Sequence, residues 1–200
     1  EGATYALMAP TETKLRRMEA FAKRMVSENG LTAQVYATTD RVEAVRDADY
    51  VICMVQVGGV GAFQMDYEIP LKYGVDQCIG DTLGPGGIFR GLRSTPVLVG
   101  LVQDMERYSK PGAILLNYTN PMAAVCYALG KVSNVPFIGL CHGVQTTLDL
   151  IAGYVGVPKN EIDYLCAGIN HMAWFLKLEH KGKNIYPIFK ERCELPEYYV

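Results

Sequence analysis

Two pairs of adjacent residues in the second half of the chain carry side chains that can bind a metal ion or transfer a proton. Cys141 and His142 lie in GLCHGVQTT, and Asn170 and His171 lie in GINHMAW some thirty residues later. A cysteine thiolate with a histidine imidazole, leaving positions open for substrate oxygens, suits a catalytic divalent transition metal. From composition alone, a buried cysteine and a hydrogen-bonded core histidine are the more common arrangement. The position of these pairs in the fold decides between the two interpretations.

A glycine-rich segment, QVGGVGAF at residues 56–63, follows a predicted strand. By itself such a segment is a weak signal, and a tight turn between a strand and a helix is its default interpretation. The carboxyl end of a strand is also where open α/β sheets bind ligands. Gln56, Gly58 and Gly59 are therefore candidate cofactor contacts.

Residues 79–96, IGDTLGPGGIFRGLRSTP, are rich in glycine and proline and are predicted to form a long loop. A loop of this length in a compact domain is more often functional than not. Arg90 and Arg93, three residues apart, are candidates for holding an anionic or hydroxyl-rich ligand. Surface salt bridges are an equally good interpretation for each arginine taken alone. Asp81, near the start of the segment, is a candidate catalytic residue.

The segment NYTNPM, residues 117–122, places two asparagines at the end of another predicted strand. Capping of the following helix, with Pro121 at its first position, is the default role of such amides. The same amides can hydrogen-bond a sugar or a nicotinamide from this edge of a sheet. Asn117 and Asn120 are therefore candidate cofactor contacts, and Asn120 is also a candidate substrate contact.

These segments lie on an alternation of short β-rich runs and longer helical patterns. The order βαβαβ predicts a parallel sheet with helices on its faces. Leu15, Met18, Ala22 and Met25 share the apolar face of the first helix. The predicted strands are residues 4–8, 34–37, 50–57, 113–118 and 136–141, and residues 50–57 are expected to be buried. The predicted helices are residues 11–30, 41–48, 97–109, 121–129 and a segment after residue 143.

The pattern changes near Tyr164, where YLCAGIN, AWFLKLEH, the turn KGKN and IYP indicate antiparallel strands and a hairpin. We predict an α/β fold with a Rossmann-like, doubly wound domain at residues 1–141 and the start of an α+β domain at residues 142–200. No glycine-rich turn of the kind that opens a dinucleotide-binding sheet precedes the first predicted strand. In the usual strand order the missing strand is central, which predicts either an earlier start of the chain or a gap in the sheet.

Composition argues against several classes of protein. The 200 residues carry a net charge of -2 with a pI near 6.0, and scattered basic residues argue against nucleic acid as a partner. The apolar runs are too short to span a membrane. Six cysteines without framework spacing indicate reduced thiols, mostly buried, and the first residues do not resemble an export leader. These features predict a soluble cytoplasmic protein.

Four segments together closely resemble glycoside hydrolase family 4, whose members use a nicotinamide dinucleotide and a divalent metal. They are DTLGPGGIFRGLR, LNYTNPMA, GLCHGVQ and CAGINHMAWFLKLE. The resemblance runs over nearly the whole chain and is closest to the melibiase-type α-galactosidases. It implies NAD and Mn2+ as cofactors, an NAD-binding domain at residues 1–141, a catalytic and metal domain that starts at residue 142, and a homodimer or homotetramer.

By position, the resemblance assigns Cys141 and His171 as metal ligands. It places Asn120 near the sugar hydroxyls and the nicotinamide, and it makes His142 a candidate acid or substrate contact. The remaining substrate contacts that it implies are Asn170, Arg90 and Arg93.

The implied reaction differs from hydrolysis by two carboxylates. NAD+ oxidises C3 of the sugar, the metal assists removal of the C2 proton, and the aglycone leaves by elimination. Water then adds at C1 and NADH reduces C3 again. The string CHGV at residues 141–144 is associated with α-glucuronidases, whereas the rest of the chain resembles α-galactosidases. We expect a non-phosphorylated α-glycoside as substrate, with an α-galactoside first and an α-glucuronide or α-glucoside as alternatives.

Two features depart from the family pattern. Ala9 follows the first predicted strand, where an acidic residue normally holds the adenosine ribose. The base that removes the C2 proton, a tyrosine or an aspartate, is expected beyond residue 200. A lactate- or malate-type dehydrogenase and an inactive fragment are the remaining alternatives, and such a dehydrogenase has no use for a metal-ligating cysteine.

Overall fold

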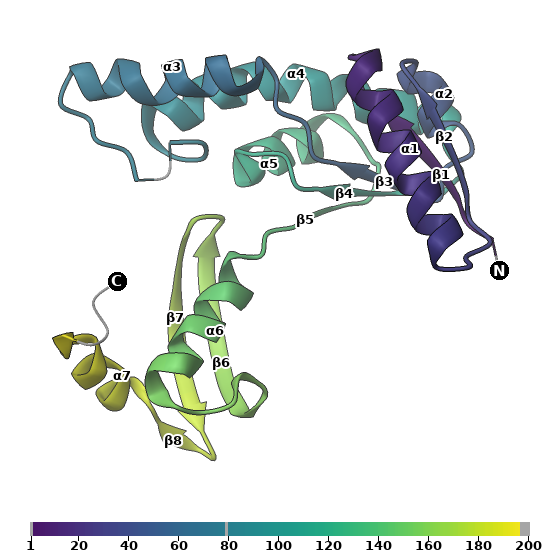
Figure 1. The fold of residues 1–200 in the computed structure, drawn as a ribbon. Helices are drawn as coiled ribbons and strands as arrows, with labels where there is room; N and C mark the ends of the chain where they lie inside the picture. Colours follow the sequence, from purple (N-terminus) through teal and green to yellow (C-terminus); the bar gives the residue numbers. More distant parts are fainter. Residues whose placement is uncertain (1, 79, 197–200) are drawn as a thin grey trace.

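The computed structural model describes residues 2–78 and 80–196, which fold into two parts (Figure 1). The first part comprises β1 (Thr4–Met8), α1 (Glu12–Glu28), β2 (Gln34–Thr38), α2 (Arg41–Val45), β3 (Tyr50–Cys53), α3 (Gly59–Lys72), α4 (Gly84–Tyr108), β4 (Ile114–Asn117), α5 (Met122–Val132) and β5 (Phe137–Gly139). The second part comprises α6 (Gly143–Val155), the 3-10 helix η1 (Lys159–Glu161), β6 (Ile162–Ile169), β7 (Met172–His180), β8 (Lys183–Asn184) and α7 (Tyr186–Cys193).

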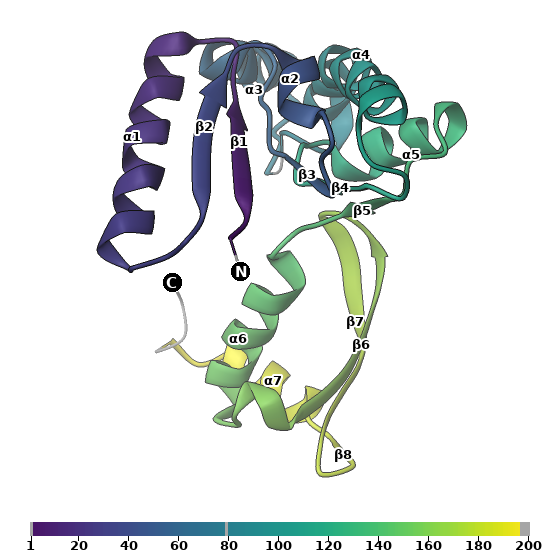
Figure 2. The same cartoon turned by 90° about the vertical axis from the view of Figure 1, so that its right-hand side faces the viewer.

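The parallel strands of the first part form two separate sheets. β1 pairs with β2, and β4 lies between β3 and β5, with every pair in parallel register. In the described part of the chain β1 and β3 do not pair, and Figure 2 shows the two sheets standing apart. The predicted parallel arrangement is confirmed, with a gap at the position that the usual strand order predicts.

Helices cover one face of the β3-β4-β5 sheet, whereas the sequence pattern predicts helices on both faces. The prediction that residues 50–57 form a buried strand is wrong, because β3 ends at Cys53 and Tyr50 and Ile52 are 67% and 58% exposed. Alternate side chains of a strand point to opposite faces, so a sheet covered on one side buries only every second residue. The covered face packs against α2, α4 and α5 through a core that includes Val45, Leu98, Val102, Leu115, Val125 and Leu129.

The predicted apolar face of α1 is buried only in part. Leu15 is buried and Ala22 is partly buried, whereas Met18 and Met25 are 55% and 47% exposed. The sheet beneath α1 has two strands, which is too narrow to cover the whole apolar stripe of a helix.

The prediction of a long loop over residues 79–96 is wrong for most of its length. Ile79 lies outside the described residues, and from Gly84 onward the segment is the first half of the long helix α4. Pro85 suits the first turn of a helix, where its missing N–H is not needed. A Cβ on Gly86 would lie 2.5 Å from the carbonyl oxygen of Gly80. The glycines therefore allow the preceding turn to lie directly against the helix.

Among the helices that the structure describes, none combines the length and the apolar character needed to cross a membrane.

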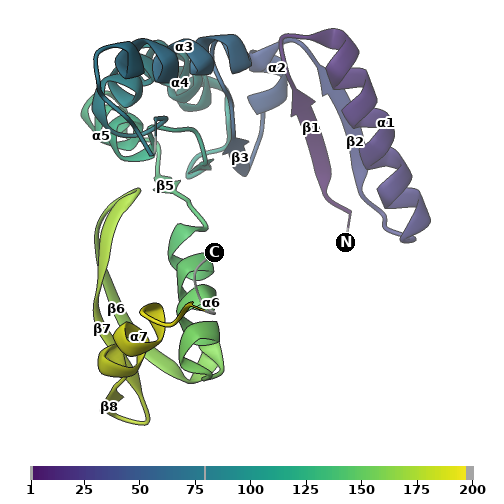
Figure 3. The same ribbon diagram turned by 60° about the vertical axis from the view of Figure 1, so that its left-hand side comes forward.

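The second part is an antiparallel hairpin with helices packed on one side (Figure 3). β6 and β7 pair from Ile162 opposite His180 to Ile169 opposite Met172, which confirms the predicted antiparallel strands. The segment IYP is not a strand, because Tyr186 and Pro187 begin α7. A second core lies between the hairpin and the helices α6 and α7, and the closed end of the hairpin points toward β5 in all three views.

Candidate active site

Three loops meet at the carboxyl edge of the β3-β4-β5 sheet. Cys53 pairs with Asn117, and Asn117 pairs with Gly139, so the three parallel strands end at the same level. The residues that follow these strands leave from one edge, which is the ligand-binding edge of an open α/β sheet. The candidate residues that follow β3, β4 and β5 therefore lie at one edge of this sheet.

Cys141 and His171 approach each other across the two parts of the molecule. Cys141 stands two residues after β5, and His171 lies in the turn between β6 and β7. Their Sγ and Nε2 atoms are 3.5 Å apart. A sulfur and a nitrogen bound to the same tetrahedral ion at ordinary bond lengths would lie about 3.5 Å apart. Within the described residues no group of three or more histidine, cysteine or acidic side chains could hold an ion.

The turn that carries His171 has two unusual features. The φ angle of His171 is 61°, in the left-handed region where glycine is preferred. The side-chain oxygen of the neighbouring Asn170 is buried and has no hydrogen-bond partner in the described chain. Backbone strain and a buried acceptor without a partner are common at functional sites. The hairpin turn accounts for the φ angle of His171, whereas the oxygen of Asn170 is free to accept a bond from a ligand.

A chain of hydrogen bonds lies behind the imidazole of His171. Oγ1 of Thr82 is 2.7 Å from Nδ1 of His171 and donates to Oδ1 of Asp81 at 2.7 Å. The other carboxylate oxygen of Asp81 accepts from Nδ2 of Asn120 at 2.8 Å. Thr82 is not among the predicted site residues, although its place beside Asp81 in DTLGPGG was a usable signal. The structure therefore joins a predicted metal ligand to two other candidate residues through a threonine.

Arg90 is part of this cluster rather than a surface residue. It is 9% exposed, and its Nε donates to the backbone oxygen of Asn120 at 3.2 Å. Its guanidinium lies over the ring of Phe63, 5.5 Å from the ring centre, and 3.9 Å from the carboxylate of Asp81. The surface salt-bridge interpretation is wrong for this arginine, because the residue is enclosed by α3, α4 and the loop after β4.

Arg93, one turn further along α4, pairs with a carboxylate that the sequence analysis missed. Its two terminal nitrogens face both oxygens of Asp66 on α3, and the side chain of Asp66 is 5% exposed. These hydrogen bonds raise the pKa of Arg93 above its usual value. Asp66 lies in an ordinary helical pattern, so the sequence carried no signal for this pair.

Asn117 supports the loop after β4. Its side chain is fully buried, its amide nitrogen donates to the backbone oxygen of Thr119 at 3.2 Å, and its amide oxygen accepts from the Thr119 N–H at 3.1 Å. The Thr119 hydroxyl in turn accepts from the N–H of Val55 at 3.0 Å, which links the loops after β3 and β4. Asn120, not Asn117, contributes to the start of α5, where its oxygen accepts from the N–H of Met122 at 3.3 Å.

The glycine-rich segment forms the predicted turn between β3 and α3. Gly58 and Gly59 have φ angles of 83° and 64°, which residues with a Cβ seldom adopt. Gln56 folds back so that its amide nitrogen donates to the backbone oxygen of Gly59 at 3.2 Å. The turn explains the glycines, and contacts of these residues with a cofactor stay a prediction.

Two further predicted positions lie at the ends of elements. His142 is exposed and is the residue before the first turn of α6. Ala9 follows the last residue of β1, as the sequence predicts.

The six cysteines are free thiols. The prediction that they are mostly buried is wrong, because only Cys53 is buried and both Cys78 and Cys193 are exposed. Burial raises the pKa of the Cys53 thiol above its usual value. Apolar neighbours in the sequence do not bury a thiol on the open face of a strand or at the end of a short helix.

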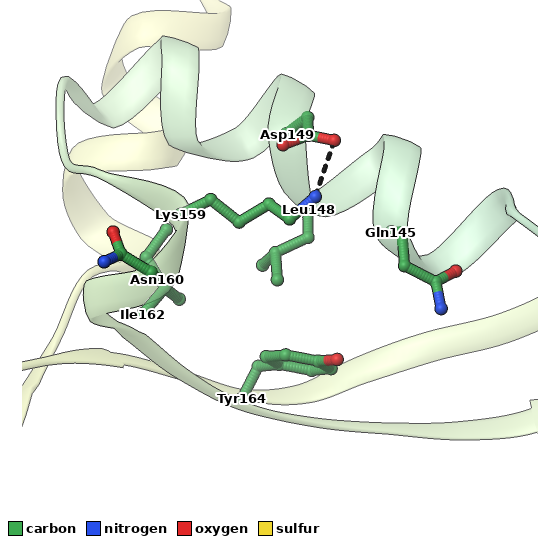
Figure 4. Close-up of a pocket in the computed structure, with 7 residues that line it drawn as sticks. All are labelled: Gln145, Leu148, Asp149, Lys159, Asn160, Ile162 and Tyr164. Carbon is green, nitrogen blue, oxygen red and sulfur yellow. Dashed lines mark hydrogen bonds and ion pairs between the residues drawn. The ribbon is translucent and has the colours of Figure 1, made fainter. Parts of the chain in front are cut away.

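A separate hollow of about 500 Å³ lies between α6 and β6 (Figure 4). Lys159 and Asp149 form an ion pair of 2.7 Å at one side, and Tyr164 lies at the other. No candidate site residue lines this hollow. The candidate residues therefore define a site at the sheet edge, not in this hollow.

Comparisons with known proteins match nearly the whole chain to the family 4 glycosyl hydrolases. A model described as "Family 4 glycosyl hydrolase" matches residues 1–157, and one described as "Family 4 glycosyl hydrolase C-terminal domain" matches residues 166–198. A curated α-galactosidase of Rhizobium meliloti (strain 1021) is 43% identical over 90% of this chain and 37% of its own length. An α-galactosidase of Bacillus subtilis (strain 168) is 38% identical over 96% of this chain and 45% of its own.

A solved structure is also similar. It is a 6-phospho-α-glucosidase from gut microorganisms in complex with NAD and Mn2+, with a TM-score of 0.86 at 25% identity, and the match covers 95% of this chain and 44% of that one. The chain thus spans less than half the length of each of these proteins.

Proposed function

The chain belongs to family 4 of the glycosyl hydrolases, and we propose that the protein hydrolyses a non-phosphorylated α-glycoside with NAD and a divalent metal ion such as Mn2+. The observation that carries the proposal is the 3.5 Å approach of Cys141 Sγ to His171 Nε2 at the carboxyl edge of a parallel sheet. The α-galactosidase relatives support an α-galactoside as substrate. The solved relative that contains NAD and Mn2+ supports the cofactors.

Cys141 and His171 would hold the ion. The side-chain oxygen of Asn170, which is buried and has no hydrogen-bond partner among the described residues, would be a further ligand. When bound, the ion supplies Lewis-acid polarisation of sugar oxygens. Asn120 and Asp81 present an amide and a carboxylate that orient the sugar hydroxyls. His142, exposed next to Cys141, is placed to exchange a proton with the departing oxygen.

The arginines and the turn after β3 complete the proposed site. Arg90, held between Phe63 and Asp81, brings positive charge to the sugar side. Arg93 lies one turn behind it and holds α3 against α4 through Asp66. The proposed contacts with the dinucleotide, from the loops after β3 and β4, are Gln56, Gly58, Gly59, Asn117 and Asn120.

We propose that the NAD-binding domain covers residues 1–141 and the catalytic and metal domain starts at residue 142. Two separate apolar cores support this boundary, one around α4, β4 and α5 and the other between α6, α7 and the hairpin. Limited proteolysis tests it, and preferential cleavage near residue 142 is the expected result.

The test of function is hydrolysis of nitrophenyl α-glycosides by the full-length protein with NAD and Mn2+. We expect release of nitrophenol from the α-galactoside that needs catalytic amounts of NAD and produces no net NADH. Net NADH formation from a hydroxy acid would favour a dehydrogenase instead. Failure to bind NAD in a calorimetric titration would favour an inactive protein. Parallel assays with the α-glucuronide and the α-glucoside test whether the CHGV string at residues 141–144 indicates the sugar that the enzyme accepts.

We also propose a cytoplasmic homo-oligomer. Six free thiols support a reducing compartment. Trp174 and Leu176 on β7 are 61% and 64% exposed, which supports burial of this strand face in an oligomer. Light scattering on the purified protein tests the oligomeric state, and a monomer would contradict it.

A further inference from the structure

We propose that Thr82 is a positioning residue that sets the tautomer of His171, so that Nε2 faces Cys141 without a proton. Thr82 is 8% exposed and lies between Asp81 and His171. The proposal deepens the proposed function, and it rests on that function only for its consequence at the metal site.

The hydrogen bonds of Thr82 can be ordered because its hydroxyl has a single hydrogen. The carboxylate of Asp81 can only accept, so the hydroxyl hydrogen of Thr82 points to Oδ1 of Asp81 at 2.7 Å. Toward His171 the same oxygen can then only accept. Nδ1 of His171, 2.7 Å away, must therefore carry the proton of the neutral imidazole. The other nitrogen, Nε2, keeps a free lone pair.

Asn120 lies at the other end of this series of hydrogen bonds, where it donates to Asp81. Its side-chain oxygen accepts from the N–H of Met122 at 3.3 Å, so its amide nitrogen faces Asp81 at 2.8 Å. Asp81 thus receives hydrogen bonds on both oxygens, one from Asn120 and one from Thr82. Each group therefore donates to the next: Nδ1–H of His171 to the oxygen of Thr82, and the hydroxyl of Thr82 to Oδ1 of Asp81.

This tautomer is the one that a metal ligand needs. Nε2 of His171 lies 3.5 Å from Sγ of Cys141, and a proton on Nε2 would stand between the imidazole and any ion held by the sulfur. Histidine ligands commonly donate their other N–H to an oxygen, which orients the ring and raises its basicity. Here that oxygen belongs to Thr82, whose own hydrogen bond to the carboxylate of Asp81 makes it a better acceptor for the imidazole N–H.

Long-range proton–nitrogen NMR of the metal-free protein reports the tautomer directly, with His171 assigned by comparison with His171→Gln. With the imidazole neutral, we expect the Nδ1–H tautomer in the parent and in Thr82→Ser. Thr82→Val removes the acceptor at 2.7 Å and leaves the Asp81 carboxylate at 3.6 Å, beyond hydrogen-bond distance, so we expect it to move His171 to the Nε2–H tautomer. The control Thr146→Val, which removes a hydroxyl bonded to helix carbonyls on α6, should leave His171 unchanged.

Asp81→Asn provides a second test that keeps the size of the side chain. Because Asn120 offers an amide nitrogen, the new asparagine would turn its oxygen to Asn120 and its own nitrogen to Thr82. The threonine hydroxyl would then donate to His171, and the tautomer would reverse. Reversal in this variant supports the proposal even if Thr82→Val does not fold.

Titration with Co2+, followed by its absorption spectrum, measures the consequence for the ion. We expect Thr82→Val to weaken binding roughly tenfold to a hundredfold and Thr82→Ser to restore it. An Nε2–H tautomer in the parent, or an unchanged tautomer in both Thr82→Val and Asp81→Asn, would overturn the proposal. An Nδ1–H tautomer in a parent that binds no Co2+ would uphold the role of Thr82 and count against the metal site itself.

Discussion

Gly87 and Thr82 lie so close that a Cβ on Gly87 would be 2.3 Å from the carbonyl carbon of Thr82. The first turn of α4 therefore packs directly on the backbone of the residue that supports His171. We expect Gly87→Ala to cost roughly 1–3 kcal/mol of unfolding free energy, as overpacking commonly does, and to weaken Co2+ binding because Thr82 must move. Urea unfolding and the Co2+ titration measure the two effects.

The matched control is Gly61→Ala in α3, where a Cβ would meet no atom within 4 Å. An alanine there should stabilise the protein by up to about 1 kcal/mol because it replaces a glycine inside a helix. Equal responses of the two variants would contradict the packing argument.

Loss of either proposed metal ligand should abolish metal-dependent hydrolysis while the protein stays folded. We expect Cys141→Ser and His171→Ala each to remove activity that depends on Mn2+. In the parent, Mn2+ should protect Cys141 from alkylation, as mass spectrometry of the labelled protein can show, and His171→Ala should remove this protection. The exposed Cys78 and Cys193 should react equally with and without the ion. Activity that survives either change, with Mn2+ still bound, would refute the ligand assignment.

The ion pair between Arg93 and Asp66 should stabilise the contact of α3 with α4. Arg93→Met leaves a carboxylate that is 5% exposed without its partner, and we expect a loss of roughly 3 kcal/mol in urea unfolding, near the lower end for a buried pair because Arg93 is 31% exposed. Adding Asp66→Asn should recover part of the loss, since the buried charge is then gone. Lys110→Met, at the exposed pair with Asp49, should have a much smaller effect.

Glu161 should make a contribution to stability that depends on pH. A hydrogen bond from Nε2 of His180, together with the charge of Lys181, holds the pKa of Glu161 below its usual 4.5. Because folding lowers the pKa of this carboxyl, the ionised group stabilises the fold at any pH above its pKa in the unfolded chain. This stabilisation is lost as the pH falls through the pKa in the folded protein. We expect Glu161→Gln to lower Tm at neutral pH and the difference to vanish in acid. High salt should reduce the difference, and a difference independent of pH would contradict the assignment.

Much of the fold follows from local patterns, and the errors have a common physical cause. β1 matches its predicted bounds, and the antiparallel hairpin appears where alternation predicts it. The burial of β3 and α1 was overestimated because periodicity reports which side chains are apolar, not what covers them. Residues 84–96 read as a loop because glycine and proline are weak helix formers, and only the packing of Gly86 and Gly87 against the preceding turn explains their presence.

The site was predictable where its chemistry lies in the side chain itself. Residue type marked Cys141 and His171 as possible metal ligands, only the family resemblance paired them, and the structure brings them together. Phe63 and Asp66 were missed because their roles arise from neighbours far along the chain, which spacing in the sequence does not reveal. Thr82 was missed although it adjoins Asp81, because its contact with His171 is 89 residues away in the sequence.

Cys141 follows β5, a strand that packs on the first core, by two residues, whereas His171 lies at the far end of a hairpin that is anchored in the second core. Eight residues of extended chain make that hairpin a lever about 26 Å long, so a tilt of about 5° at its base moves the imidazole by about 2 Å. Two separately folded bodies must therefore be in alignment before both ligands can reach one ion. The affinity of the proposed site for an ion should therefore depend on the relative orientation of the two parts. Substitutions near α7 should alter that affinity although they contact neither proposed ligand.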